Sequence, residues 1–243
     1  MQIGLCESNK EYKLWKKAEI LNQQKNKDEA LKIYLELFEN NQANYDYLKK
    51  INEILIEKQD YKLLIKCYNE YLENLLSINN KFEVEVKLLE IKIWDQDIEW
   101  INYLYTLEKQ YENDKNKKNK FEFILHQLFK NNKIEEGYNF VLFLRNKYNI
   151  PSFYSRKLIS IFKKKNKFKQ SINESIIYLN HKSTNKLSGV TKNILIEQVF
   201  DLIQIIIDDT KLDKTYLPIS SKQISSNKFL NINKNYIYES NEI

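Results

Sequence analysis

Residues 14–37 read LWKKAEILNQQKNKDEALKIYLEL, and residues 48–71 read LKKINEILIEKQDYKLLIKCYNEY. Within each stretch, apolar residues three and four positions apart stand on both sides of a short polar turn, which is the pattern of two amphipathic helices. The two stretches match at a spacing of 34 residues, most clearly at the pairs Leu14 and Leu48, Ala30 and Leu64, and Tyr34 and Tyr68. The sequence therefore predicts a helix–turn–helix unit that recurs every 34 residues.

The same period can be followed through most of the chain. It predicts five units, over residues 11–44, 45–78, about 79–117, 121–151 and about 152–185. Small residues are expected where neighbouring helices come closest, at Ala18, Ala30, Gly137 and Ser171. The polar run at 113–120 is expected to be an exposed loop or a helix end.

The third unit fits two registers. Its helices are expected at residues 82–94 and 98–111, on either side of a turn at residues 95–97. One register turns Val84, Leu88, Ile91 and Leu104 toward the core, and the other turns Phe82, Val86 and Leu89 toward it. The sequence leaves this choice open.

Composition supports an all-α fold. Three glycines and two prolines among 243 residues leave long stretches without a helix breaker. We therefore expect an α-solenoid of about five repeats. The net charge of +6 permits an acidic partner but requires none. Cys6 and Cys67 are too far apart in sequence to suggest a disulfide framework, which favours reduced thiols in a cytoplasmic protein.

The C-terminal part of the chain changes character. Residues 1–186 are expected to form the repeat array, residues 187–210 an apolar capping helix and residues 211–243 an irregular tail. The segment Ile194–Ile207 is apolar on more than one face, which predicts that the tail or a second copy of the chain covers it. Polar residues interrupt this segment, and it is shorter than the roughly 20 residues of a membrane-spanning helix, so no span is expected.

The residue types that catalysis or metal binding requires are not gathered in the sequence. No two glycines lie near each other, so no glycine-rich phosphate loop is present. Cysteine and histidine do not occur at metal-ligand spacings, and the two histidines, His126 and His181, are 55 residues apart. We therefore expect no catalytic residue, no metal ion and no cofactor, and a protein that is not an enzyme.

The repeats resemble those of tetratricopeptide-repeat proteins over most of residues 11–185. Ala18 and Ala30 match the small residues of that family's pattern, whereas Asn52 and Leu64 replace them in the second unit, so the repeats are degenerate. In that family, the first helix of each unit lines a concave groove that binds extended peptides or partner helices. Carried over by position, the groove contains Tyr12, Trp15, Glu19, Asn22, Lys49, Glu53, Glu122, His126, Arg156 and Lys163.

The resemblance implies a non-catalytic scaffold that holds a protein or peptide partner. Some members of the family clamp a chaperone's C-terminal carboxylate with a lysine and an asparagine, at the positions of Trp15 and Glu19 here. These two side chains do not supply the cationic and amide donors that a carboxylate needs, so a co-chaperone function is not expected. Trp15 also has a simpler interpretation as a packing residue.

Two other functions stay open. The tail and the apolar segment before it favour an N-terminal or accessory helical region of a larger enzyme or assembly. The lysine-rich run at residues 163–169 raises nucleic-acid binding, although a solvated turn explains these lysines more simply, so nucleic acid is not the expected partner.

Overall fold

The computed structural model describes residues 2–75, 81–96, 99–180 and 200. This part of the chain forms ten α-helices and no strand, which confirms the predicted all-α class. The helices belong to two compact units, and we call Met1–Asn131 unit 1 and Asn132–Ile243 unit 2. The predicted capping helix and tail lie outside the described residues, apart from Phe200.

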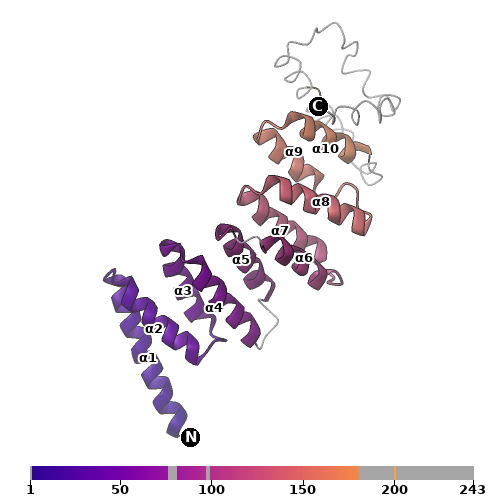
Figure 1. Ribbon diagram of the computed structural model, residues 1–243. Helices are drawn as coiled ribbons and strands as arrows, with labels where there is room; N and C mark the ends of the chain where they lie inside the picture. Colours follow the sequence, from indigo (N-terminus) through magenta and orange to yellow (C-terminus); the bar gives the residue numbers. More distant parts are fainter. Residues whose placement is uncertain (1, 76–80, 97–98, 181–199, 201–243) are drawn as a thin grey trace, which may run out of the picture. The chain divides into compact units, whose positions relative to one another are not determined.

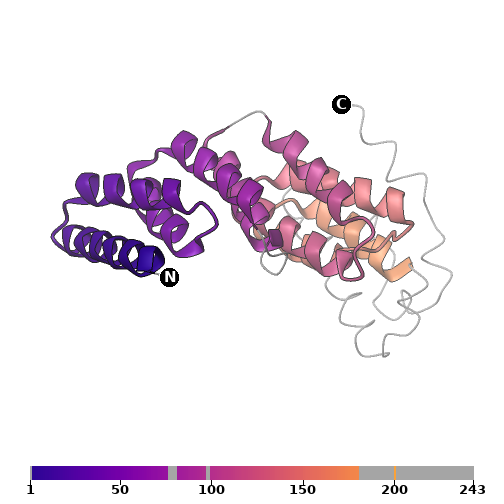
Figure 2. The same ribbon diagram turned by 90° about the horizontal axis from the view of Figure 1, so that it is seen from below.

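The described part of unit 1 contains seven helices. Neighbours in sequence lie side by side, as α1 and α2 do, and α3 and α4 (Figures 1 and 2). In chain order the helices are α1 (Gln2–Gln23), α2 (Lys27–Asn40), α3 (Tyr45–Lys58), α4 (Tyr61–Asn74), α5 (Lys81–Trp94), α6 (Trp100–Tyr111) and α7 (Lys117–Lys130). The polar run at 113–120 is a short loop followed by the first turn of α7.

Unit 2 continues the pattern with α8 (Ile134–Tyr148), α9 (Ser155–Lys164) and α10 (Phe168–Asn180). Helices α9 and α10 form a closely packed antiparallel pair (Figure 1). Within unit 1 consecutive helices pack on one another, and α9 packs on α10 in unit 2; packing between neighbours in sequence is the defining property of an α-solenoid, so the predicted architecture is confirmed.

One residue with a left-handed backbone lies in each of five connections between consecutive helices. These residues are Lys25, Gln59, Gln96, Asn132 and Asn166, with φ between 56° and 63°. The first two and the last two are each 34 residues apart, so the backbone itself repeats with the period of the sequence. Such a residue ends a helix by letting the next amide groups bond to its last carbonyls, and glycine is the usual choice because it has no Cβ. Here lysine, glutamine and asparagine take that role.

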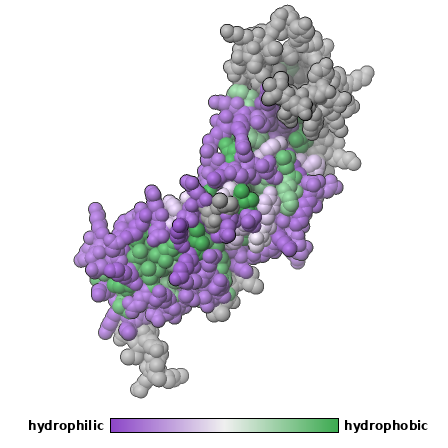
Figure 3. Space-filling model, in the orientation of Figure 1, coloured by the Kyte–Doolittle hydropathy of each residue, from purple (hydrophilic) through white to green (hydrophobic). Residues whose placement is uncertain are grey.

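The small residues occupy the close contacts that the spacing predicts. Ala18, Ala30 and Ser171 are completely buried, and Gly137 is buried as well. Ser171 also donates a hydrogen bond of 3.2 Å from its hydroxyl to the carbonyl oxygen of Ile159. In unit 1 the buried apolar side chains form one core that extends from α1 to α5, and Figure 3 shows hydrophobic side chains (green) between hydrophilic ones (purple) on one face of this unit.

Helix α5 is buried on almost every side, which explains why its register was ambiguous. Val84 and Leu88 of one register and Val86 and Leu89 of the other are all at most 3% exposed. An all-round apolar helix is typical of a central position in a core. Most residues of both patterns are therefore buried, whereas Phe82 is only half-buried.

Two carboxylates of α5 are buried with partners from other helices. Glu85 accepts a hydrogen bond of 2.8 Å from the Gln110 side-chain amide, and another from the Tyr111 hydroxyl. Glu90 is paired with Lys87 at 2.7 Å and with Lys130 of α7 at 3.1 Å. Pairing of this kind is what makes a buried charge tolerable.

Because of Glu90, unit 1 is expected to lose stability at acidic pH. Burial alone raises the pKa of Glu90, but the hydrogen bonds and charges of Lys87 and Lys130 more than offset this, so the pKa lies below its ordinary value. Because the pKa of Glu90 is lower in the folded protein, its ionised carboxylate stabilises the folded state at every pH above the unfolded pKa of about 4.3. This contribution to the free energy of unfolding is lost as the pH falls through the folded pKa. We expect Glu90→Gln to lose about 1–2 kcal/mol at pH 7 and to show a weaker loss of stability than wild type below about pH 4.3.

Urea unfolding between pH 3 and pH 7 measures this effect. Glu83→Gln is the matched control, because Glu83 lies on the same helix and is exposed. If the free energy of unfolding changes equally with pH in wild type and in Glu90→Gln, the role assigned to Glu90 is wrong.

Unit 2 is held by a buried ion pair. Arg145 of α8 donates to both carboxylate oxygens of Glu174 in α10, at 3.0 and 2.7 Å. The same guanidinium donates to the Phe153 carbonyl oxygen at 3.0 Å and to the Ser155 hydroxyl at 2.8 Å. Arg145 is 7% exposed and Glu174 is completely buried. One side chain therefore ties together α8, the loop after it and the final helical hairpin.

Candidate partner-binding face

Helices α1 and α3 present the best-defined group of predicted groove residues. We call Tyr12, Trp15 and Glu19 of α1, with Lys49 and Glu53 of α3, the α1/α3 face. Tyr12 is 60% exposed, Trp15 and Glu19 are half-buried, and Lys49 and Glu53 are exposed. Residues four or seven apart on a helix share a side, so each helix contributes a continuous stripe.

Trp15 anchors this face to the core. Its ring lies 5.3 Å from the ring of Tyr34 in an edge-on arrangement and 5.4 Å from the ring of Tyr47. Tyr47 also donates a hydrogen bond to the carboxylate of Glu11 on α1. These contacts join α1 to α2 and α3, so packing accounts for Trp15 and leaves only part of its ring for a partner.

The two carboxylates of the α1/α3 face stand in equivalent positions of the first two repeats. Glu19 pairs with Lys16 at 3.1 Å, and Glu53 pairs with Lys50 at 3.7 Å. Both pairs link residues three apart on one helix, and both members recur 34 residues later in the sequence. Exposed pairs of this kind contribute between zero and about 1 kcal/mol, so another cation can replace the lysine at little cost.

Tyr34 is close enough to both carboxylates for their charges to affect its pKa, and its hydroxyl differs from its counterpart in the second repeat. The hydroxyl of Tyr68 donates a hydrogen bond of 3.1 Å to the side-chain oxygen of Asn52. In the first repeat, Ala18 stands where Asn52 stands in the second, so no side-chain acceptor is available there. The Tyr34 hydroxyl is buried and has no hydrogen-bond partner. An unsatisfied buried hydroxyl costs about 1–3 kcal/mol.

Burial and two nearby charges affect the pKa of Tyr34. Burial is the main cause that raises its pKa to about 12, and the charges of Glu19 and Glu53 raise it further. The phenol therefore stays protonated.

The other predicted groove residues lie elsewhere. Asn22 is half-buried near the end of α1, and Glu122 and His126 lie one turn apart on α7. Arg156 and Lys163 are exposed on α9 in unit 2, so they form a separate set from the residues of unit 1.

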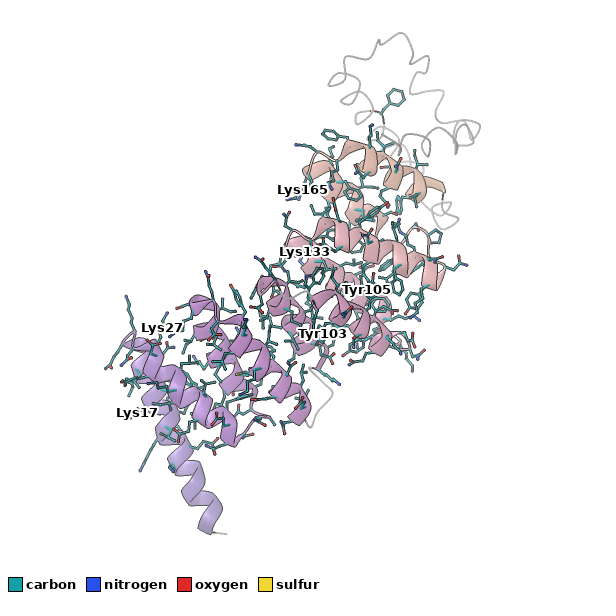
Figure 4. The ribbon with its side chains drawn as sticks, in the orientation of Figure 1. Lys17, Lys27, Tyr103, Tyr105, Lys133 and Lys165 are labelled. Atoms are coloured by element: carbon teal, nitrogen blue, oxygen red, sulfur yellow. The ribbon has the colours of Figure 1, made fainter. Side chains whose placement is uncertain are left out.

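Part of the lysine-rich end of unit 2 is engaged within the protein. Lys165 donates a hydrogen bond of 2.8 Å to the Asn132 side-chain oxygen, and Lys167 is 3.6 Å from a carboxylate oxygen of Glu135. Figure 4 shows Lys165 and Lys133 at the turns of consecutive hairpins. These lysines join one hairpin to the next, which accounts for them without a phosphate ligand.

The described part of the chain contains neither a metal-binding cluster nor a membrane-spanning helix. Among the residues that the structure describes, no three or more histidine, cysteine and acidic side chains are grouped so that they could hold a metal ion. None of the helices described here is long and apolar enough to span a membrane.

The fold defines a helical-repeat protein. No protein-family model matches the chain, and no curated protein matches it either.

Sequence reasoning named Trp15, Glu19 and Glu53 but treated Tyr34 only as a core residue. Two signals could have drawn attention to it. The motif Lys-x-x-Glu occurs at residues 16–19 and again at 50–53. The second signal is that Ala18 and Asn52 occupy the same position of the two repeats, while the tyrosine is present in both.

Proposed function

We propose that this protein is a non-catalytic interaction module of the tetratricopeptide-repeat type, which binds a peptide or helical segment of a partner protein on the α1/α3 face. The observation that carries the proposal is the pair of repeat-related carboxylates, Glu19 and Glu53, beside the partly exposed ring of Trp15 and the exposed ring of Tyr12. Tryptophan and tyrosine side chains are enriched among interface hot spots. The cytoplasmic location that the sequence predicts is part of this proposal.

The arrangement also supports binding on physical grounds. The helices of unit 1 are held by a continuous core, so the face is formed before any partner arrives. A preformed surface loses less conformational entropy on binding than a flexible one, which favours affinity.

A selection of displayed random peptides against the purified full-length protein tests this function. Selected peptides are synthesised and titrated against wild type and against the double variant Glu19→Lys/Glu53→Lys. Glu36→Lys is the matched control, since Glu36 is exposed on the outer side of α2. We expect saturable binding that the double variant weakens at least about tenfold, which corresponds to about 1.4 kcal/mol, and that the control leaves unchanged. A failure to select any peptide, or binding indifferent to the double variant, would overturn the proposal.

A further inference from the structure

The positive charge of the chain is gathered in unit 2. Residues 1–131 contain 21 lysines and 23 acidic residues, whereas residues 132–180 contain ten lysine and arginine residues and three glutamates. This local excess of positive charge is larger than the net charge of +6 of the whole chain. A charge asymmetry of this kind favours binding of a polyanion to the positive part.

Four of these cations share the exposed side of α9. A helix turns by about 100° per residue, so Arg156, Lys157, Lys163 and Lys164 lie within an arc of about 120°. All four are exposed, and so is Ser160 between them, whereas the opposite side of α9 is buried. We call these five residues the α9 basic face.

The charges of this face are available to a partner. None of the four cations forms an ion pair or a side-chain hydrogen bond with another residue of the described part of the chain. Residues 155–169 contain no acidic residue, and Glu174, the one carboxylate of the α9–α10 hairpin, is buried against Arg145. In the sequence the run at residues 163–169 stood out, but two of its lysines are engaged within unit 2, as described above, and the available cations lie mainly on the helix before the turn.

We propose that the α9 basic face binds the phosphate backbone of double-stranded RNA without reading its sequence. This inference goes beyond the peptide binding proposed for the α1/α3 face, because it concerns another surface in the other unit. Arg156 and Lys157 precede Lys163 and Lys164 by seven residues, which is about 10 Å along the helix axis. The face can therefore contact more than one phosphate at once, and the Ser160 hydroxyl can donate a hydrogen bond to one of them.

The composition of the face decides between a duplex and other polyanions. Lysine is depleted at protein–protein interfaces, whose centres are apolar and aromatic, and the α9 basic face includes no apolar or aromatic side chain. Binding in the plane of an anionic membrane needs an apolar side that enters the lipid. Single strands are held by stacking of their bases on aromatic rings. A duplex backbone requires only positive charge and polar groups.

Duplex RNA suits this face better than duplex DNA. The major groove of A-form RNA is too deep and narrow for side chains to read, so proteins recognise duplex RNA mainly through phosphates and 2′-hydroxyls. Proteins that read DNA place a helix in the major groove, with side chains that form hydrogen bonds to base edges. Lysine ammonium groups instead act as point charges toward phosphates. The cytoplasmic location proposed above also favours RNA, and the choice of RNA rests on it in part.

Fluorescence anisotropy with a labelled RNA duplex of about 16 base pairs tests the inference on the full-length protein. We expect a dissociation constant of about 1–100 μM at physiological salt, and duplexes of unrelated sequence should bind equally. If the four cations contact four phosphates, the affinity should fall about a hundredfold between about 50 and 200 mM salt.

Charge variants then locate the site. Changing all four cations of the α9 basic face to glutamine should weaken binding at least about tenfold and flatten its salt dependence. Changing the three lysines of the face to arginine keeps the charge and should keep the affinity. The matched control changes four exposed lysines of unit 1 to glutamine, namely Lys13, Lys17, Lys115 and Lys118, and should alter the affinity by no more than about threefold. Because every substituted residue is exposed, each variant should unfold like wild type in circular dichroism.

Several results would overturn the inference. These are an absence of binding, binding that does not depend on salt, and a loss in the unit 1 control equal to that in the α9 variant. Four other polyanions are compared at the same concentration of negative charge: a polyglutamate peptide, phosphatidylserine vesicles, single-stranded RNA and a DNA duplex. If any of them binds more tightly than the RNA duplex, the proposed partner is wrong. Peptides selected for the α1/α3 face should bind the α9 variant as they bind wild type, so each proposal can fail without the other.

Discussion

Glu174→Ala is expected to destabilise unit 2 by about 3–5 kcal/mol, because it leaves the guanidinium of Arg145 buried without its counter-charge. The pair is bidentate, with distances of 3.0 and 2.7 Å, and neither residue is more than 7% exposed. A loss of stability of that size is a substantial fraction of the roughly 5–15 kcal/mol that typically separates a folded protein from its unfolded state. Unit 2 should therefore lose its helical structure at much lower urea concentration.

Far-ultraviolet circular dichroism during urea unfolding is the appropriate measurement. The three tryptophans, Trp15, Trp94 and Trp100, all lie in unit 1, so their fluorescence monitors that unit only. Glu135→Ala is the matched control, since the Glu135 side chain is 83% exposed. The apolar double variant Arg145→Leu/Glu174→Leu should recover much of the lost stability. A change below about 1 kcal/mol in Glu174→Ala would show that the pair is not needed.

Trp15→Ala is expected to destabilise unit 1 by about 2–4 kcal/mol, since it removes a large half-buried ring and two aromatic contacts. Those contacts, to Tyr34 and Tyr47, join α1 to α2 and α3. Fluorescence of the two remaining tryptophans during urea unfolding measures the effect. Trp15→Phe should lose considerably less, because it keeps an aromatic ring in place.

Tyr12→Ala is the matched control for Trp15. The Tyr12 ring lies on the same helix but is 60% exposed, so its removal should change stability by no more than about 0.5 kcal/mol. If Trp15→Ala is as stable as Tyr12→Ala, the ring is a free binding surface and not a packing residue. The expected result also means that binding studies should use the glutamate variants, since loss of binding by Trp15→Ala would be confounded by partial unfolding.

Most of the fold could be predicted because its signals are local. Apolar spacing placed the helices expected at residues 82–94 and 98–111 within two residues of the bounds of α5 and α6, and the 34-residue period matches the spacing of the turns at Lys25 and Gln59. The left-handed residues at those turns could not be predicted, because lysine and glutamine rarely adopt that backbone and nothing marks them in the sequence. The sequence also did not predict that α1 begins at Gln2, well before Tyr12.

The buried charges could not be predicted for a different reason. Arg145, Glu90 and Glu174 would ordinarily be taken for solvated residues, since charged side chains are almost never buried unless paired. Their partners lie on other helices, with Arg145 and Glu174 29 residues apart. Such pairing depends on how the repeats stack, which the spacing of apolar residues does not specify.

The candidate site was predicted in part. Position in the repeat identified Glu19 and Glu53, and the structure shows that both act electrostatically on Tyr34. The hydroxyl of Tyr34 lacks a partner, and Ala18 stands where Asn52 accepts a hydrogen bond of 3.1 Å from Tyr68 in the second repeat. Distances of that kind come only from a structure.

The neighbour-to-neighbour packing of the helices has a consequence for how the chain folds as it is made. Because most contacts between helices of unit 1 join neighbours in the chain, these contacts are close in sequence, and low contact order goes with folding in microseconds to milliseconds. Synthesis proceeds at about 5–20 residues per second. Helices α1 to α4 can therefore assemble, with Glu19 and Glu53 in place, seconds before the ribosome has completed unit 2.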